Sequence, residues 1–457
     1  MSPAEPRDVR ILAVFLALVV ATGVALVAAT RIDRYPGVPA ARGSLVLEGG
    51  TVFDGTGAAA RAARVVVTGD RIACVGDGCP VPDAARVIDA TGLAVLPGLV
   101  DLKAHFASAD PDDAGRALPL RMWDYARQRP RVRRALHRAG VTTIRELGNV
   151  KDTALALKHD VAAGRLSGPR VFAAGPVFTA PSGIPVATEF AGNVYLIEAV
   201  TRQVSDAERA RAAVQRLAAD GVDGIAAVVD GGIVDDLPRL EPAVLRAAAT
   251  EAHRNGLWVA VSTGRGRDVR DALSAGADTI QFGAIFDGPL DAETLSLMRD
   301  RDVTFVPVLA DVERFLVWAS SADRPATFPP AAWSALREAI GHAGVAGVME
   351  PMLASVQRAA AAGVRIGTGT STASFGTSLH RELELLVQSG LAPGAALVAA
   401  TRDAARALRA ERDFGTVETG KRADLVVVGG RPWERIADVR DVRLVIQAGR
   451  VVVDGAR

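Results

Sequence analysis

The sequence predicts an α/β protein: a TIM-type (β/α)8 barrel, a small β-sandwich domain built from both chain ends, and an N-terminal transmembrane helix. Three observations predict this arrangement. Residues 99–408 alternate short apolar strands with helical segments, about eight strands in all, which is typical of such a barrel. Residues 44–98 and 409–457 hold short strands separated by glycine-containing turns. Residues 11–29 form an apolar run without a charged residue.

The composition agrees with a folded protein and excludes one class of partner. A chain of 457 residues with 49% hydrophobic content can hold one large domain and a smaller one. A net charge of +1 gives no reason to expect nucleic acid as a partner. The six histidines are spread thinly, and no Cys/His metal-binding cluster is present in the sequence. The oligomeric state stays open.

The N-terminal apolar run has the length of a membrane span. As a helix, residues 11–29 would be about 28 Å long, close to the thickness of the hydrocarbon core of a bilayer. Arginines flank both ends, so charge bias does not decide the orientation. A cleaved signal peptide is the alternative. We expect a tail over residues 1–10, a single-pass cell-membrane anchor over 11–29 and a linker over 30–43, with the folded part outside the cytoplasm.

Short strands are predicted at both ends of the chain, and they suggest one domain assembled from the two ends. Before the barrel, the strands are Ser44–Leu47, Arg64–Val67, Ile72–Val75, Arg86–Asp89 and Leu93–Leu96. After the barrel, they are Asp424–Val428, Arg443–Ile446 and Arg450–Asp454.

The two cysteines of the chain, Cys74 and Cys79, are separated by a turn with two glycines. That turn can reverse the chain and bring the two Cα atoms within disulfide range. The alternative is a pair of unrelated thiols. If the N-terminal helix exports the domain, the pair is expected to be oxidised.

The middle of the chain alternates strands and helices. The predicted strands after the first one are Val141–Arg145, Arg170–Gly175, Gly224–Val229, Leu257–Val261, Thr279–Phe282, Val303–Val308 and Val364–Ile366. The predicted helices are Asp206–Asp220, Glu241–Asn255, Val269–Ala275 and Leu379–Ser389.

The first barrel strand lies in the stretch Val95–Phe106, where a Pro-Gly turn leads into a short buried strand. Polar residues then alternate at Asp101, Lys103 and His105. Because side chains alternate with period 2 along a strand, we expect these three on one side of it.

This stretch resembles the opening barrel strand of the amidohydrolase superfamily, in which Pro-Gly-Leu-Ile/Val-Asp leads into His-x-His. Its imidazolonepropionase- and prolidase-like branch is the nearest match. Further segments resemble the same family, namely Gly140–Arg145, Gly168–Arg170, Glu251–Gly256, Ala275–Ile280, Glu382–Leu386 and Gly415–Val428. The resemblance implies a barrel mouth with one or two divalent metals, usually zinc. Such a metal polarises an amide or ester carbonyl and lowers the pKa of a bound water.

The resemblance also implies where the metal ligands belong, and most of these positions differ here. His105 stands where the second histidine of the motif belongs, but Lys103 replaces the first. A protonated lysine cannot donate to a metal, and one histidine cannot hold zinc alone. The remaining positions, which carry lysine, histidine, histidine and aspartate in the family, are Ala226, Ser262, Phe282 and Ser371. We therefore expect no metal and no other cofactor.

The other histidines offer no replacement for the missing ligands. His253 is near a predicted helix C-terminus, where a positive or dipolar group is favourable without any function. His105 is either a pocket residue or an ordinary buried, hydrogen-bonded histidine. The remaining four lie in helical patterns and are predicted to be surface residues: His137, His159, His342 and His380.

Two functions follow from this conflict between fold and site. We favour a membrane-tethered, non-catalytic protein, a pseudoenzyme that binds a protein partner or a small ligand such as a carboxylate held by Lys103. The alternative is an active hydrolase of carbon–nitrogen bonds (non-peptide, cyclic amide or dipeptide) or ester bonds through a rebuilt site. The sequence contains no Gly-x-Ser-x-Gly elbow, which argues against a serine nucleophile. Further pocket or acid–base candidates are Glu146, Asp230, Thr263 and Gln281.

Overall fold

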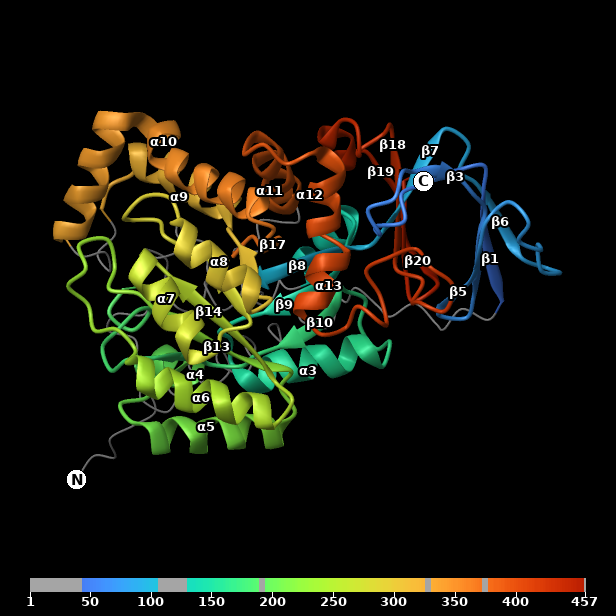
Figure 1. Ribbon diagram of the computed structural model, residues 1–457. Coiled ribbons are helices and arrows are strands. Elements are labelled where there is room, and N and C mark those ends of the chain that lie inside the picture. Colours follow the sequence, from blue (N-terminus) through green and yellow to red (C-terminus); the bar gives the residue numbers. More distant parts are fainter. Residues whose placement is uncertain (1–42, 106–129, 189–193, 325–329, 372–376, 456–457) are drawn as a thin grey trace, which may run out of the picture.

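The computed structural model describes residues 43–105, 130–188, 194–324, 330–371 and 377–455. The predicted tail, membrane span and almost all of the linker lie outside the described residues. Figure 1 shows two parts side by side, a large α/β body and a smaller part made of strands.

The smaller part consists of two sheets. One sheet has the strand order β5-β4-β1-β6 and the other β20-β19-β18-β7-β2-β3. From the N-terminal end come β1 (Ser44–Glu48), β2 (Thr51–Val52), β3 (Arg61–Ala62), β4 (Val65–Thr68), β5 (Arg71–Val75), β6 (Arg86–Asp89) and β7 (Leu93–Pro97). From the C-terminal end come β18 (Leu425–Gly429), β19 (Val442–Gln447) and β20 (Arg450–Asp454).

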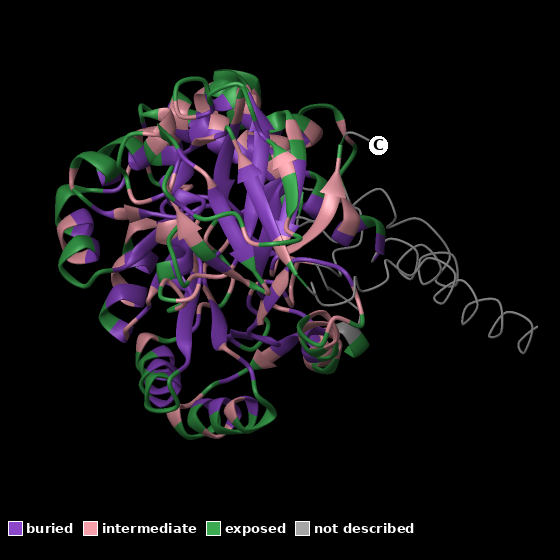
Figure 2. Ribbon diagram, turned by 90° about the vertical axis from the view of Figure 1, so that its right-hand side faces the viewer, coloured by how far each residue is buried: buried purple, intermediate pink, exposed green. Residues whose placement is uncertain are grey.

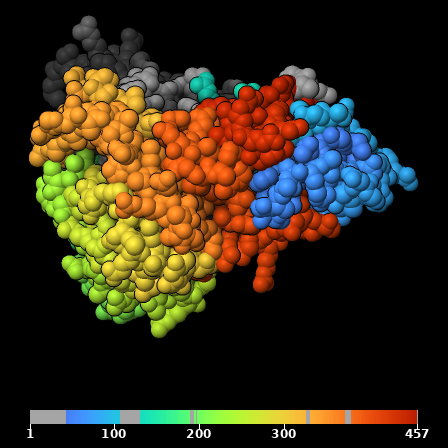
Figure 3. Space-filling model, turned by 45° about the horizontal axis from the view of Figure 1, so that its top comes forward, coloured from blue at the N-terminus to red at the C-terminus, as the bar shows by residue number. Residues whose placement is uncertain are grey.

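Both chain ends share the six-stranded sheet, because β18 pairs antiparallel with β7. In the space-filling view the two ends, blue and red, accordingly lie side by side (Figure 3). Alternate residues of the strands meet in one apolar cluster that draws on both sheets, including Leu45, Val65, Val67, Leu425 and Leu444. Period-2 burial of branched side chains therefore holds the two sheets together.

Cys74 and Cys79 form a disulfide in this part, with their Cα atoms 5.8 Å apart. Cys74 lies on β5, which pairs antiparallel with β4. Both cysteines belong to a small buried cluster with Val46 and Val66.

The α/β body holds ten further strands in two parallel sheets, of order β10-β9-β8 and β12-β11-β13-β14-β15-β16-β17. Backbone hydrogen bonds join the two sheets at two places. Asp223 N donates to Ala173 O over 2.8 Å, and Leu102 N donates to Thr368 O over 2.8 Å. The strands are β8 (Leu99–Ala104), β9 (Val141–Glu146), β10 (Arg170–Ala173), β11 (Val177–Thr179), β12 (Thr201–Gln203), β13 (Gly224–Val229), β14 (Trp258–Thr263), β15 (Thr279–Gln281), β16 (Thr304–Val306) and β17 (Arg365–Ile366).

Helices lie outside these strands and are buried only on the side that faces them (Figures 1 and 2). Helix α5 illustrates why they start and stop where they do: Asp206 accepts a bond from Arg209 N at one end, and Gly221 adopts φ 91° at the other. Besides a helix over residues 130–138, the helices are α3 (Lys151–Ala162), α4 (Val194–Val200), α5 (Ala207–Asp220), α6 (Pro242–Arg254), α7 (Gly266–Ala275), α8 (Ala292–Asp300), α9 (Leu309–Ser321), α10 (Pro330–Ala361), α11 (Thr377–Gln388), α12 (Pro393–Ala399), α13 (Arg402–Ala407) and the 3-10 helix η2 (Ile436–Arg440).

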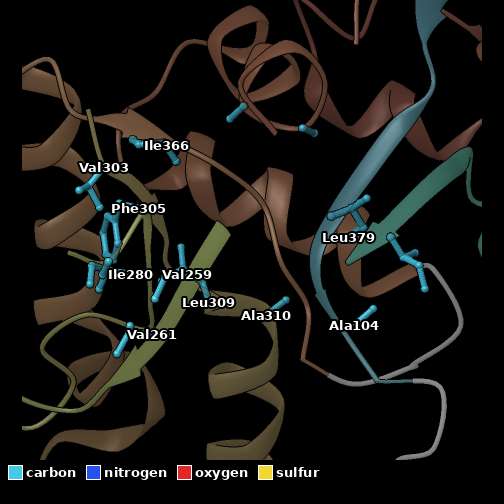
Figure 4. Packing of buried hydrophobic residues seen from close by; sticks show 14 of the residues in the cluster. Ala104, Val259, Val261, Ile280, Val303, Phe305, Leu309, Ala310, Ile366 and Leu379 are labelled. Carbon is cyan, nitrogen blue, oxygen red and sulfur yellow. The ribbon is translucent and has the colours of Figure 1, made fainter. Parts of the chain in front are cut away.

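Apolar side chains on the outer side of the strands fill the space under these helices. In Figure 4, Phe305 lies beside Val303 and Ile280, and all three belong to the largest buried cluster. This cluster extends through α5, α6, α7 and α11, so it fixes most of the helices to the strands.

One helix of the described residues, α10, is long and apolar enough to cross a membrane by length and composition. It is not one continuous helix, because Gly344 has φ 67° and ψ 171°, and Pro351 lies in its second half. Figure 1 shows the bend. Trp333 of α10 contacts Trp318 of α9 with ring centroids 5.7 Å apart, so the helix packs on its neighbour. The sequence did not predict either helix.

Two histidines expected on the surface are buried, so that prediction was wrong. His137 is 1% exposed and His380 is 3% exposed. His137 Nε2 contacts Gln447 on β19, and His380 Nε2 is 2.8 Å from Ala139 O. Burial lowers the pKa of each imidazole to about 4. His159 and His342 lie exposed, as predicted.

Candidate functional site

Strand β8 does not alternate regularly, and this changes which side chains face the interior of the α/β body. Leu102 belongs to an apolar cluster with Val306, and Phe282 packs against the same cluster. Lys103, the next residue, places Nζ 4.9 Å from the centroid of the Phe282 ring. The pairing of β8 with β9 shifts register between Asp101 and Ala104. Two consecutive residues therefore face the same region.

Asp101 does not share a side with Lys103 and His105, so the period-2 prediction was wrong. Its Oδ1 accepts bonds from Lys103 N over 3.0 Å and from Thr370 N over 3.1 Å. Its Oδ2 accepts a bond from Thr370 Oγ1 over 2.6 Å. Burial raises the pKa of Asp101 to about 6, against the lowering effect of these bonds. Asp101 thus ties the irregular part of β8 to the segment after β17.

His105 follows β8 directly and has a buried carboxylate beside it. Its Nδ1 lies 3.8 Å from Oε1 of Glu146, the last residue of β9. Glu146 is 1% exposed, whereas the His105 side chain is 25% exposed. Asn149 Nδ2 donates to Glu146 Oε1 over 3.1 Å, and Asn149 Oδ1 accepts a bond from Val150 N. The arrangement leaves Nε2 of His105 on the ring edge away from the carboxylate.

The backbone around Lys103 is closely packed. A Cβ atom at Gly369 would lie 2.9 Å from the Lys103 Cβ, so a side chain there would displace the lysine. Ser371 N donates to Lys103 O over 2.6 Å. Ser371 and Phe282, two of the positions where the family has metal ligands, adopt φ values of 56° and 66°. Non-glycine residues in this region of backbone space are strained, and such strain clusters at functional sites.

The remaining candidates on β14 and β15 divide into interior and structural residues. Ser262 is half-buried and pairs in register with Gln281. Thr263 Oγ1 donates to Gly283 O over 3.0 Å, and Gln281 Nε2 donates to Thr279 Oγ1 over 2.7 Å. The Thr263 hydroxyl and the Gln281 amide nitrogen thus bond to the strand ends, whereas Gln281 Oε1 is buried without a partner among the described residues.

Two further candidates lie on or after β13. Ala226 is buried in an apolar cluster with Trp258 and Ala260, so it lines the interior without a polar group. Asp230 accepts a bond from Gly232 N over 2.8 Å, and burial raises its pKa to about 6. A Cβ atom at Gly264 would lie 2.5 Å from Asp230 Oδ1, so this carboxyl packs against the end of β14.

The residues at these positions do not fit the metal that the family implies. Within the described ranges, no group of three or more His, Cys, Asp or Glu side chains could hold a metal ion. His105 has one carboxylate neighbour, and the Lys103 ammonium occupies the position of the other histidine. A zinc site needs about three or four protein ligands.

The structure also contains a cavity of about 450 Å³ at the other end of the strands. Thr304 and Arg365, which line it, are the first residues of β16 and β17. His105 follows the last residue of β8, so this cavity is remote from it. Three of the arginines that line it are paired, Arg365 and Arg406 with Asp302 and Arg409 with Asp278. We therefore place the candidate site at His105 and Lys103.

Sequence reasoning missed Asn149, Arg145 and Trp258. Asn149 follows Glu146 by three residues, and this spacing was the available signal. Arg145 and Trp258 come from strands far apart in sequence, and only their contact reveals them.

Residues 94–452 match the model of the amidohydrolase family. The chain belongs to this family. Ochratoxinase from Aspergillus niger is 24% identical over 428 residues, which cover 86% of this chain and 82% of the relative. Adenine deaminase 2 from Rhizobium etli is 26% identical over 441 residues, which cover 92% of this chain and 59% of the relative.

Solved structures agree with this assignment. A Xaa-Pro dipeptidase with bound methionine has a TM-score of 0.76 and 27% identity, covering 89% of this chain and 99% of that one. A putative prolidase from Bifidobacterium longum has a TM-score of 0.72 and 27% identity, covering 90% and 94%. The predicted membership of the family is confirmed. Because the relatives are enzymes, the comparisons favour a hydrolase of carbon–nitrogen bonds over the non-catalytic protein that we expected.

Proposed function

We propose that this protein hydrolyses a carbon–nitrogen bond of a small amide, through a site rebuilt without the family's metal. The observation that carries the proposal is the His105–Glu146 pair at the ends of β8 and β9, with Nδ1 and Oε1 3.8 Å apart. Similarity to dipeptidases and prolidases supports a dipeptide or an N-acylated amino acid as the substrate.

In this proposal His105 is the general base. Glu146 fixes the ring through Nδ1, so that Nε2 removes a proton from water as the water attacks the carbonyl carbon. The imidazolium that forms is stabilised by the buried carboxylate, in the way a triad aspartate stabilises its histidine. A separation of 3.8 Å exceeds a hydrogen bond. Such contacts often shorten when substrate binds.

Lys103 supplies the positive charge that the metal supplies in relatives. Its ammonium lies over the Phe282 ring, and its backbone carbonyl accepts bonds from the segment after β17. A fixed cation there stabilises negative charge that develops on the carbonyl oxygen. Since an ammonium is no Lewis acid for water, the attacking water needs a separate base, and His105 provides it.

A second candidate function is that of a binding protein without catalysis. The observation that favours it is the apolar or cationic chemistry at several former ligand positions, with Ala226 buried among Trp258 and Ala260 and with Lys103 against Phe282. Such a protein would hold a carboxylate ligand on Lys103.

One experiment separates the two functions. The chain, treated with a chelator, is assayed against dipeptides, N-acyl amino acids, lactams and esters, beside the variants His105→Ala and Lys103→Met. Turnover that survives chelation and disappears in His105→Ala supports the hydrolase. If no substrate turns over but a carboxylate raises the melting temperature of the wild type and not of Lys103→Met, the binding protein is correct.

We further propose that β8 to β17 close into the (β/α)8 barrel of the family, with the composite strand domain beside it as a β-sandwich. The bond from Leu102 N to Thr368 O and the bond from Asp223 N to Ala173 O support closure, since they join the two parallel sheets. Boundaries near residues 98 and 409 agree with the pairing of β7 and β18.

We also propose that the chain is tethered to the cell membrane through residues 11–29 and folds outside the cytoplasm. The Cys74–Cys79 disulfide supports this compartment, because disulfides persist in oxidising environments. Thiols are alkylated before lysis and counted in the purified chain. Two protected cysteines are expected, whereas two alkylated ones would place the domain in the cytoplasm.

A further inference from the structure

The interior of the α/β body holds a positive charge that no carboxylate bonds to among the described residues. Arg145, on β9, is 0% exposed, and its Nε donates to Leu102 O over 2.6 Å. Its Nη1 and Nη2 atoms are buried and have no hydrogen-bond partner within the described ranges. Asp278 and Asp101 influence its pKa only through their charge.

A second unsatisfied donor lies beside this guanidinium. The Arg145 Cζ atom is 5.0 Å from the centroid of the Trp258 ring. Trp258 Nε1 is likewise buried and has no partner in the part of the chain that the structure describes. The residues around the indole have small side chains. A Cβ atom at Gly224 would lie 2.1 Å from the indole, so only glycine fits there, and Ala226 and Ala260 belong to the same cluster.

The chemistry of these atoms specifies what would satisfy them. A guanidinium and an indole N–H can only donate hydrogen bonds. Burial lowers the pKa of Arg145 to about 9, so the side chain keeps its charge at neutral pH. A buried charge with unpaired donors is costly. The face of the Trp258 ring offsets part of the charge but accepts none of the Nη bonds. Water could accept these bonds, whereas an anion accepts them and also supplies a full opposite charge.

We propose that Arg145 and Trp258 form a binding site for one small anion, of the halide or carboxylate type, inside the α/β body. The site has a structural connection to the candidate active site. Arg145 Nε holds the carbonyl of Leu102, which directly precedes Lys103 in the irregular part of β8. An anion on the guanidinium therefore stabilises the segment that presents Lys103.

The site is tested with bromide, which scatters anomalously and substitutes for chloride. Crystals of the chain soaked in bromide are expected to show an anomalous peak within hydrogen-bond distance of Arg145 Nη atoms and Trp258 Nε1. In solution, the melting temperature is expected to rise saturably with chloride or bromide against isethionate, a bulkier anion, at constant ionic strength. Neither readout depends on hydrolysis, so failure of the proposed function leaves this test intact.

Trp258→Phe keeps an aromatic ring and removes one donor. It is expected to weaken anion binding about tenfold, as for one charge-assisted hydrogen bond. Trp433→Phe, in a residue that stacks on Phe53 in the other part of the molecule, is the matched control and should bind as the wild type does. Arg145→Lys keeps a charge and should lose saturable stabilisation.

The source of the anion is decided by competition. Acetate that displaces bromide and inhibits turnover indicates a substrate carboxylate, whereas acetate that leaves the peak unchanged indicates an inorganic ion. Ordered waters at Arg145 in place of an anomalous peak would overturn the proposal. Equal bromide affinity in the wild type and Trp258→Phe would show that Trp258 does not contribute to the anion site.

Discussion

At the scale of single residues, the site depends on two buried carboxylates with different surroundings. Asp101 is held by the backbone of Thr370 and Lys103 and fixes the chain. Glu146 instead has its Oε1 3.8 Å from Nδ1 of His105, whereas the His105 charge acts on Asp101 only as a minor influence on its pKa. A carboxylate that faces a half-exposed imidazole can orient it, whereas one that faces backbone amides cannot. In the proposed mechanism, this difference makes Glu146 the residue that positions His105, and Asp101 a residue that supports the chain.

Glu146→Gln removes the charge behind His105 and keeps the shape. We expect kcat of the amide hydrolysis to fall by about a hundredfold or more, in the range of general-base contributions, with little change in KM. The melting temperature should stay near that of the wild type. Glu338→Gln, at a glutamate whose side chain is 75% exposed, is the control. An unchanged kcat would remove Glu146 from the mechanism.

The two buried histidines predict how stability depends on pH. The pKa of His137 is about 4 in the folded state, against an ordinary value of 6.5 for histidine. The unfolded chain therefore binds more protons between these values, and stability falls as the pH drops from 6.5 to 4. For His137 the loss is about 3 kcal/mol, at 1.36 kcal/mol per pKa unit.

Urea unfolding of wild type and His137→Gln at pH 7 and pH 5 measures this loss. From pH 7 to pH 5, the free energy of unfolding should decrease less in the variant than in the wild type, because glutamine does not titrate. Asp101 changes the free energy of unfolding in the opposite direction. Because its pKa is raised in the folded state, its stabilising contribution is present at low pH and is lost as the pH rises through about 6. The comparison with the variant cancels that contribution. An equal decrease in both proteins would mean that His137 is not buried neutral.

At the scale of elements, a buried glutamate controls the start of α9. Glu382 on α11 is 0% exposed, and its Oε2 accepts a bond from Ala310 N over 2.7 Å. The first amides of a helix lack partners within the helix, so this carboxyl caps α9 from a neighbouring element. Burial raises the pKa of Glu382 to about 8. The capping group is therefore the neutral acid at pH 7.

Glu382→Gln tests the neutral state. The pKa of Glu382 is about 8 in the folded state, against an ordinary value of 4.5 for glutamate. Its contribution to wild-type stability is therefore fully present below pH 4.5 and decreases as the pH rises to 8. Glutamine keeps the acceptor and does not ionise. We expect the variant to match the wild type at pH 4.5 and to exceed it by a few kcal/mol at pH 8, at 1.36 kcal/mol per pKa unit, in denaturant unfolding. A variant less stable than the wild type at pH 8 would show that the ionised form is the cap.

At the scale of the whole molecule, the fold agrees with the family more closely than the predicted ligand positions do. The family model covers residues 94–452, which span the α/β body and the strands from the C-terminal end. The positions that the family resemblance assigns to metal ligands carry lysine, alanine and phenylalanine, among others. A fold can keep its packing while its site changes, because packing and chemistry depend on different residues.

The metal content of the purified chain tests whether the family's metal site is absent. We expect less than one transition metal per chain after purification from metal-supplemented medium, because His105 alone cannot retain zinc against water and a chelator. Elemental analysis of wild type and His105→Ala checks this. About one zinc per wild-type chain, absent from the variant, would restore the metal mechanism of the family.

The sequence alone determined the family and most of the strands, and it predicts which metal-ligand positions are altered. Short runs of β-branched and other apolar residues, such as β4 and β18, are local signals, because a strand buried on both faces shows as a continuous apolar run in the sequence. The Pro-Gly-Leu-Val-Asp stretch and the segment around Gly415 carried the family resemblance by spacing. Both patterns can be recognised in the local sequence, without knowledge of which elements lie beside them in the structure.

Only the tertiary structure decided which groups meet. The register shift in β8 turns Asp101 away from Lys103, and it arises from pairing with β9 and with the segment after β17. His137 and His380 are buried because other elements cover their helices, which helical periodicity cannot reveal. The contacts of His105 with Glu146 and of Arg145 with Trp258 join separate strands. Contacts between strands depend on the register in which the strands pair. Local sequence patterns do not encode the register between strands that are far apart in the sequence.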